Sequence, residues 1–261
     1  MIGDNNDFGL ALVMTLPIFF FLAQSEMRPW IRRFFGLLCL ITIPAIFFTY
    51  SRGALAGLVV VLALMLLGSR QRLLLIPVVA FGTIVAINFA PEAWQQRMNV
   101  TGGIVDASAR SRLNAWSFCW ALASDYPVTG GGFATFTPEL FNRYAPNVLD
   151  VHNSHSVYFG VLAEHGFIGL LLYAALIVSC FLTTSHLVKV ALRHGDQTAA
   201  HYAHMLRFSI VGFLVSGMFL SRSYFDYFFT IVAAVAILKR VCDVDWYETE
   251  ESEMQDEEVL A

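Results

Sequence analysis

The chain has 261 residues, of which 57% are hydrophobic and 14% are charged, and its formal net charge is −4. A composition this apolar excludes an ordinary soluble domain and indicates a membrane protein. We therefore expect membrane lipids, and not nucleic acid, among its partners.

Seven apolar runs approach the roughly 20 residues that a helix needs to cross the hydrocarbon core of a bilayer. They predict an all-α fold, a polytopic membrane protein with about seven transmembrane helices. Charged or turn-forming residues separate the runs, which lie at 8–23, 34–50, 53–68, 73–90, 156–184, 205–221 and 224–238.

The basic residues lie unevenly on the two sides of this predicted bundle. Ten lysines and arginines fall in one set of connections and six in the other, and the richer side is expected to be cytoplasmic. The longest connection, 91–155, is then expected to lie on the outer side of the membrane. The six basic residues on that side are Arg52, Arg97, Arg110, Arg112, Arg143 and Arg222.

Acidic residues mark both ends of the chain. Asp4 and Asp7 precede the first apolar run, where a signal peptide would carry positive charges, so we expect this run to stay in the membrane. Seven spans and a cytoplasmic C-terminus place Met1 outside, which suggests the C-terminal part of a longer membrane protein or a shortened relative. Residues 1–240 form the predicted membrane domain, and the acidic segment 241–261 is expected to be a disordered cytoplasmic tail.

The loop 91–155 is the one sizeable polar region, so we expect the reactive groups there. Its segment ASARSRLNAWSFCWALASDYP has aromatic residues at mixed helical spacings, which predicts an interfacial helix that Pro127 ends. Trp116 and Trp120 would then lie in the headgroup layer or pack in a core. The glycines at 130–132 permit a sharp turn or a close backbone approach to a partner, and the turn is favoured.

Arginines near the outer surface suggest an anion site. Arg52, in TYSRGAL between two apolar runs, should face a cavity or an anionic group, although snorkelling to headgroups is an equal alternative at a span end. Arg110 and Arg112, taken alone, fit solvated charges on a helix. Together, the three guanidiniums suit a diphosphate, whose oxygens accept paired hydrogen bonds. Arg222 could pair with Asp226 across a short outer turn or extend this site.

The segment DVHNSHSVYFGVLAEHG, residues 150–166, contains the candidate base. If a helix begins near Ser154, His155 lies in its first turn at the water boundary, where a neutral imidazole can accept a proton from a hydroxyl. His152 could orient His155, contact phosphate or have no role. Glu164, nine residues beyond His155, would face the opposite side of a straight helix, which favours structural pairing between helices.

Three segments occur in this order in the chain: TYSRGALAGL, RLNAWSFCWALASDYPVTGGGFATF and HSVYFGVLAEHGFIGLLLY. They contain a serine-arginine-glycine between spans, an arginine four residues before a tryptophan, and a histidine nine residues before a glutamate-x-glycine. In these features the chain resembles the bacterial O-antigen ligase and polymerase superfamily. The segment RYAPNVLDVHNSHSVYF is most similar to the O-glycosylation ligases that accompany exosortase-type systems. Where that family often has asparagine directly after the histidine, this chain has Ser156.

The resemblance implies a multi-pass glycosyltransferase of the bacterial inner membrane, active at the periplasmic face. Such an enzyme transfers a glycan from undecaprenyl diphosphate to an acceptor hydroxyl on a protein, lipid or glycan, without a metal or other cofactor. By position, Arg52 and Arg112 are expected to hold the diphosphate, and His155 is expected to activate the acceptor. Family members usually have more spans upstream, so a shortened chain could be inactive alone.

Other functions stay open from the sequence. A polysaccharide polymerase of the same superfamily fits the same residues, whereas a lipid-linked glycan transporter would use the arginines and Glu164 without His155 as a base. A cysteine transpeptidase would need Cys119, whose apolar neighbours indicate packing. A metal-dependent transferase would need the motif DVD at 243–245, which lies on the predicted cytoplasmic side.

Overall fold

The computed structural model describes residues 5–67 and 104–260, and within these ranges every regular element is a helix. The predicted all-α class is therefore confirmed, while the predicted span 73–90 lies outside the described residues. In chain order the helices are α1 (Asn5–Ser25), α2 (Pro29–Phe47), α3 (Arg52–Leu67), α6 (Ile104–Asp125), α7 (Pro138–Tyr144), α8 (Val157–Arg193), α9 (Gln197–Gly217) and α10 (Asp226–Leu260).

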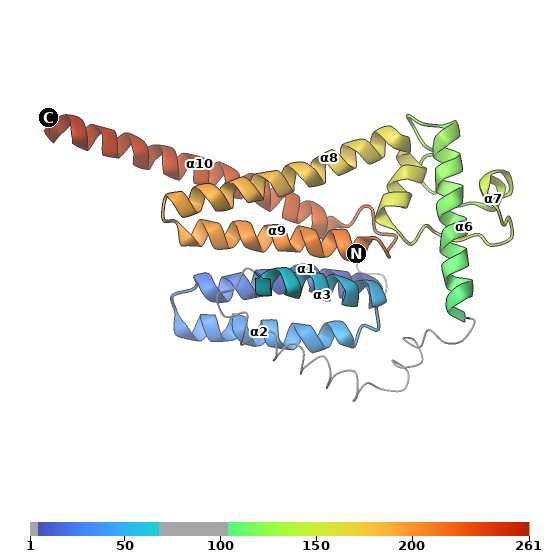
Figure 1. Ribbon diagram of the computed structural model, residues 1–261, viewed down its shortest axis with the longest axis horizontal. Coiled ribbons are helices and arrows are strands. Elements are labelled where there is room, and N and C mark those ends of the chain that lie inside the picture. The colour runs from blue at the N-terminus through green and yellow to red at the C-terminus, as the bar shows by residue number, and fades with distance from the viewer. Residues whose placement is uncertain (1–4, 68–103, 261) are drawn as a thin grey trace.

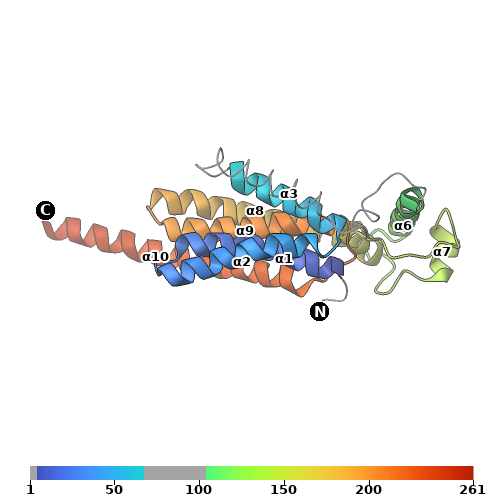
Figure 2. The same cartoon turned by 90° about the horizontal axis from the view of Figure 1, so that it is seen from below.

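The helices α1, α2, α3, α8, α9 and α10 lie side by side as a bundle, and α6 crosses one end of it (Figure 1). Figure 2, turned by 90°, shows α6 almost end-on and α7 beyond it, so α6 is roughly perpendicular to the bundle axis. We call residues 104–156, which contain α6 and α7, the cap, and the adjacent end of the bundle the cap end. The C-terminus of α10 extends past the opposite end (Figure 1).

Helix α9 lies in the middle of the bundle, where α1, α3, α8 and α10 pack against it. Phe213 of α9 is fully buried and stacks on Phe228 of α10, with ring centroids 4.2 Å apart. The buried hydroxyl of Ser209 donates a hydrogen bond of 2.7 Å to the carbonyl of Met14 in α1. This inter-helix bond satisfies a polar group that would be costly to leave unpaired inside the bundle.

Three described helices are long and apolar enough to cross a membrane: α1, α2 and α8. Helix α3 is a shorter apolar helix of 16 residues. Helices α9 and α10 overlap the predicted spans 205–221 and 224–238 but are not among the candidates. The first half of α9 carries polar side chains such as Arg207. The structure thus supports a membrane protein, and the number of seven spans stays a prediction.

Helix α8 consists of two parts joined at a kink. Gly166 has φ 66° and ψ −167°, a conformation that only glycine adopts readily. The N–H groups that follow the kink are satisfied from outside the helix, since Phe167 N–H donates to the carbonyl of Pro127 at 2.8 Å. The second part, 167–193, is about 40 Å long, which is enough to cross a bilayer.

The glycine-rich turn after α6 caps the first part of α8. The N–H groups of Gly131 and Gly132 donate to the carbonyls of Ala163 and Glu164, at 2.8 and 3.1 Å. A Cβ at Gly130 would lie 2.6 Å from the 164–166 backbone, so a side chain would not fit there. The glycines therefore make a turn, as favoured from the sequence, and also a close backbone approach to the chain's own helix.

The predicted helix in the loop is present as α6, and it ends at Asp125, two residues before Pro127. One face of α6 is buried against α7 and α8 through Ala115, Phe118, Cys119 and Leu122, all fully inaccessible. Their i, i+3, i+4, i+7 spacing is that of a helix face turned to a core. The opposite face exposes Trp120, which is 58% accessible.

The structure of the acidic C-terminal segment differs from the prediction. Residues 241–260, predicted to be disordered, continue α10 as helix. Extending a helix that has already formed adds a hydrogen bond for each residue fixed, without the cost of a new nucleus. Glutamate, which is frequent in this segment, also has high helix propensity.

Candidate active site

Hydrogen bonds hold α6 beside the connection that precedes α8. The side chain of Asn114 donates to the carbonyls of Asn147 (2.9 Å) and Asp150 (3.1 Å) and accepts from the N–H of Asn147 (2.8 Å). The indole N–H of Trp116 donates to the carbonyl of Ser154 at 2.8 Å. These bonds place the arginine-bearing helix of the cap directly against the histidine-bearing connection.

The two arginines expected to hold a diphosphate are near each other. Arg112 of α6 is half-buried, and burial together with the positive charge of Arg52 lowers the pKa of its guanidinium. Arg52 is the first residue of α3, so α3 and the cap each contribute one cation. Like charges repel, and an anion bound by both arginines would relieve the repulsion. Arg110, the third arginine of the expected cluster, is exposed on α6.

The candidate base lies just before α8. This helix begins at Val157, close to the start of the predicted run 156–184. The condition of a start near Ser154 is therefore not met, and His155 precedes the helix instead of lying in its first turn. His155 has φ 45°, a left-handed conformation that turns the chain before Ser156 takes the N-cap position. Its N–H donates to Oγ of Ser221 at 2.8 Å, and the residue is exposed.

His152 contacts a carboxylate within the same connection. Its Nε2 lies 2.8 Å from Oδ1 of Asp150, whose other oxygen accepts a hydrogen bond of 2.7 Å from Ser111 in α6. The structure thus engages His152 with a carboxylate that also ties the connection to α6.

Glu164 and His165 share one partner, Tyr224, which the sequence analysis did not single out. The Tyr224 hydroxyl donates to Oε2 of Glu164 at 2.5 Å and lies 2.6 Å from Nε2 of His165. The Tyr224 hydroxyl has a single proton, which it donates to the Glu164 carboxylate. Its oxygen therefore accepts the hydrogen bond from Nε2–H of His165. The pairing joins α8 to the α9–α10 connection, and a separation of 60 residues from Glu164 leaves no local sequence signal for it.

Arg222 lies on the same α9–α10 connection and forms an ion pair with Asp7 of α1. The Asp7 side chain is only 3% exposed, so its charge requires a partner inside the bundle. The expected partners were Asp226 or a diphosphate, both suggested by local spacing. The partner in α1 appears only once the fold brings the two ends of the chain together.

Cys119, the one cysteine in the predicted outer loop, is fully buried in the cap core. Burial raises the pKa of its thiol, which therefore stays protonated and unreactive. The cysteine transpeptidase considered from the sequence thus lacks an accessible nucleophile in this part of the chain.

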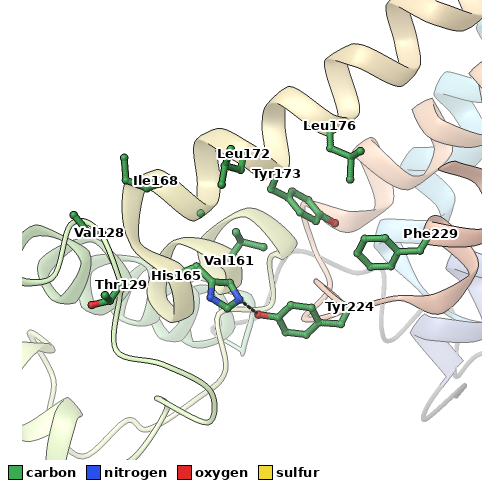
Figure 3. Close-up of a pocket in the computed structure, with 11 residues that line it drawn as sticks. Val128, Thr129, Val161, His165, Ile168, Leu172, Tyr173, Leu176, Tyr224 and Phe229 are labelled. Atoms are coloured by element: carbon green, nitrogen blue, oxygen red, sulfur yellow. Dashed lines mark hydrogen bonds between the residues drawn. The ribbon is translucent and has the colours of Figure 1, made fainter. Parts of the chain in front are cut away.

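Two pockets flank Tyr224. One, of about 600 Å³, has mostly apolar walls from α8 and α10, with the bonded Tyr224 and His165 side chains at its edge (Figure 3). The other, of about 320 Å³, lies on the side of His155, and most of the residues that line it are polar. Its polar lining residues are Asn153, Ser154, Glu164, Ser221, Ser223 and Tyr224.

Fold and site together define a helical membrane protein whose cap end holds two interacting arginines, a histidine and two pockets. A protein-family model described as O-antigen ligase matches residues 37–174, more than half of the chain. The chain belongs to the O-antigen ligase family. The matched region contains Arg52, Arg112, His155 and Glu164, whereas Tyr224 lies outside it. A search of curated proteins gave no match.

Proposed function

We propose that the chain is a glycosyltransferase that moves a glycan from undecaprenyl diphosphate to an acceptor hydroxyl at the periplasmic face of the bacterial inner membrane. The observation that carries the proposal is the proximity of Arg52 and Arg112, the latter on a helix hydrogen-bonded to the connection that holds His155. Membership of the family supports glycosyl transfer in general. The proposal includes seven spans, with the cap in the periplasm.

In the proposed reaction, the imidazole of His155 accepts the proton of the acceptor hydroxyl while the hydroxyl oxygen bonds to the anomeric carbon of the glycan. The bond between that carbon and the diphosphate oxygen breaks, and the electron pair leaves with the diphosphate. Arg52 and Arg112 stabilise the negative charge that grows there in the transition state. The proton then passes from the imidazole to solvent.

The substitution His155→Asn tests the base. Asparagine tolerates the left-handed backbone of this position but offers no imidazole, so folding should be preserved. We expect glycan transfer in membranes to fall about 10²- to 10⁴-fold, the usual contribution of a general base. Binding of undecaprenyl diphosphate should stay within about twofold, because the arginines remain.

His152→Asn is the matched control, since His152 is exposed on the same connection but pairs with Asp150. It should retain most of the transfer activity. Transfer that persists in His155→Asn would remove the base from the proposal, and lipid movement across the membrane without transfer would favour the transporter. Assays with three acceptors, a protein, a lipid and a glycan end, separate a ligase from a polymerase. Transfer to the glycan end indicates a polymerase, and transfer to a protein supports the predicted similarity to exosortase-associated O-glycosylation ligases.

A further inference from the structure

The polar pocket beside Tyr224 shares a wall with the candidate base. Asn153 and Ser154, which line it, directly precede His155 in the chain. A third lining residue, Ser221, accepts the hydrogen bond from the N–H of His155. A group bound in this pocket would therefore lie next to the atoms that react under the proposed function.

The described residues that line the pocket provide hydrogen-bonding groups and include no lysine or arginine. Oε2 of Glu164 accepts from Tyr224, while Oε1 has no partner among the described residues. The hydroxyl of Ser221 accepts one N–H and keeps its own proton to donate. Phe136 adds an aromatic surface. A carboxylate among neutral groups disfavours a phosphate and suits a ligand that both donates and accepts hydrogen bonds.

Glu164 is held in place from behind. His165 donates to the Tyr224 hydroxyl, which donates to Glu164, so the tyrosine fixes one carboxylate oxygen and leaves the other for a ligand. The backbone there is fixed as well, because Gly132 N–H caps the carbonyl of Glu164. A group positioned in this way can orient a ligand at little further cost in side-chain entropy.

We propose that this pocket binds a neutral sugar ring next to the bond being formed, with Glu164 accepting hydrogen bonds from ring hydroxyls and Tyr224 as its positioning residue. The volume of about 320 Å³ falls at the small end of the range for ligand sites, which fits a short saccharide. The proposal rests on the proposed function. The sugar comes either from the lipid-linked donor or from a glycan acceptor, and both present the same hydroxyl chemistry.

Photo-crosslinking in native membranes tests occupancy of the pocket even when the glycan has not been identified. The full chain carries p-benzoylphenylalanine in place of Asn153, an exposed residue that lines the pocket, and in a second variant in place of Asn142, an exposed residue of α7. After irradiation, mass spectrometry should find a sugar on the peptide containing position 153 and not on the control peptide. A sugar still joined to diphosphate lipid identifies the donor, and a sugar without phosphate identifies an acceptor.

Kinetics test the role of the carboxylate. Glu164→Gln should raise the KM for the sugar-bearing substrate about tenfold or more, as expected when a hydrogen bond to a charged group is lost, with a smaller change in kcat. Tyr224→Phe should raise the same KM, and the double variant should add little, because the two residues act as a unit. Glu139→Gln on the exposed surface of α7 and Tyr227→Phe, whose hydroxyl contacts Thr15, should leave KM unchanged.

The outcomes separate this inference from the proposed function. Normal transfer that depends on His155, combined with no sugar at position 153 and an unchanged KM in Glu164→Gln, overturns the pocket and leaves the glycosyltransferase intact. A sugar adduct at position 153 in a chain without His155-dependent transfer keeps the pocket as a saccharide site and overturns the proposed reaction.

Discussion

At the scale of single residues, Arg110 and Arg112 lie on the same helix, α6, but differ in their surroundings. Arg112 is half-buried near a second guanidinium, whereas Arg110 is exposed. We expect Arg112→Ala to raise the Kd for glycan-free undecaprenyl diphosphate about 10- to 100-fold, the loss expected for hydrogen bonds to a charged group. The binding of a fluorescent analogue to the purified protein measures this change.

Arg110→Ala is the control for this measurement, because an exposed charge is screened by salt and contributes little. The Kd of Arg110→Ala for glycan-free undecaprenyl diphosphate should stay within about threefold of the Kd of the unsubstituted chain at physiological ionic strength. Equal losses in the two variants would show that general positive charge of the cap, and not a site built around Arg112, attracts the lipid.

The ion pair between Arg222 and Asp7 predicts a stability effect. Arg222→Gln leaves a nearly inaccessible carboxylate without this cation, which should cost about 3–5 kcal/mol of unfolding free energy. The double variant Arg222→Gln with Asp7→Asn should recover most of that loss, because the buried negative charge is removed together with its cation. Chemical unfolding in detergent measures both. If Arg222→Gln instead weakens diphosphate binding without loss of stability, the arginine belongs to the anion site.

Residue types, spacing and the family resemblance together led to the prediction of Arg52, Arg112 and His155 as site residues, and in the structure the charge of Arg52 acts on Arg112. The roles of the three residues stay predictions. Partners that are distant in the chain could not be selected in this way. Tyr224 contacts Glu164 only because the α9–α10 connection folds back onto the kinked start of α8. Such contacts depend on packing between helices, for which a single sequence carries no spacing rule.

At the scale of elements, the kink in α8 depends on Gly166. A Cβ at this position would lie 2.5 Å from the carbonyl oxygen of Pro127, and φ 66° with ψ −167° disfavours any other residue. Gly166→Ala should therefore lower the free energy of unfolding by about 1–3 kcal/mol, the cost of such backbone strain. Thermal unfolding followed by circular dichroism measures the loss.

Gly36→Ala provides the comparison, because a Cβ at this position of α2 meets nothing within 4 Å. Alanine in a helix interior is favoured over glycine, so this variant should be unchanged or more stable by up to about 1 kcal/mol. A Gly166→Ala variant as stable as Gly36→Ala would mean that α8 can straighten, and the contact of Glu164 with Tyr224 should then be lost.

The elements were predictable where one physical rule dominated. Apolar runs located α1, α2 and much of α8, and Pro127 located the end of α6. The kink could not be predicted, because an E-x-G sequence is also compatible with a continuous helix. The helix is interrupted because N–H groups of the distant glycine-rich turn bond to its carbonyls. The buried face of α6 could not be assigned from the sequence either. Its tryptophans are the most apolar-looking residues and favoured a helix at the membrane surface, whereas small residues such as Ala115 give no comparable signal of burial.

At the scale of the whole molecule, the arrangement of charge and helices predicts an orientation. The cap, with its paired arginines, lies at one end of the bundle, and the acidic extension of α10 leaves the other (Figure 1). The α8–α9 turn, which carries Arg193 and follows Lys189, lies at the end away from the cap. Basic residues favour the cytoplasmic side in short connections, so the cap should face the periplasm.

Two single cysteines test this orientation. The native cysteines are buried or half-buried, so the exposed positions Glu139→Cys in α7 and Thr198→Cys at the α8–α9 turn should dominate labelling. In spheroplasts, a membrane-impermeant maleimide should label position 139, and it should reach position 198 only after permeabilisation. The reverse pattern would place the cap in the cytoplasm, away from a periplasmic donor, and labelling of both positions in intact spheroplasts would contradict a membrane-spanning bundle.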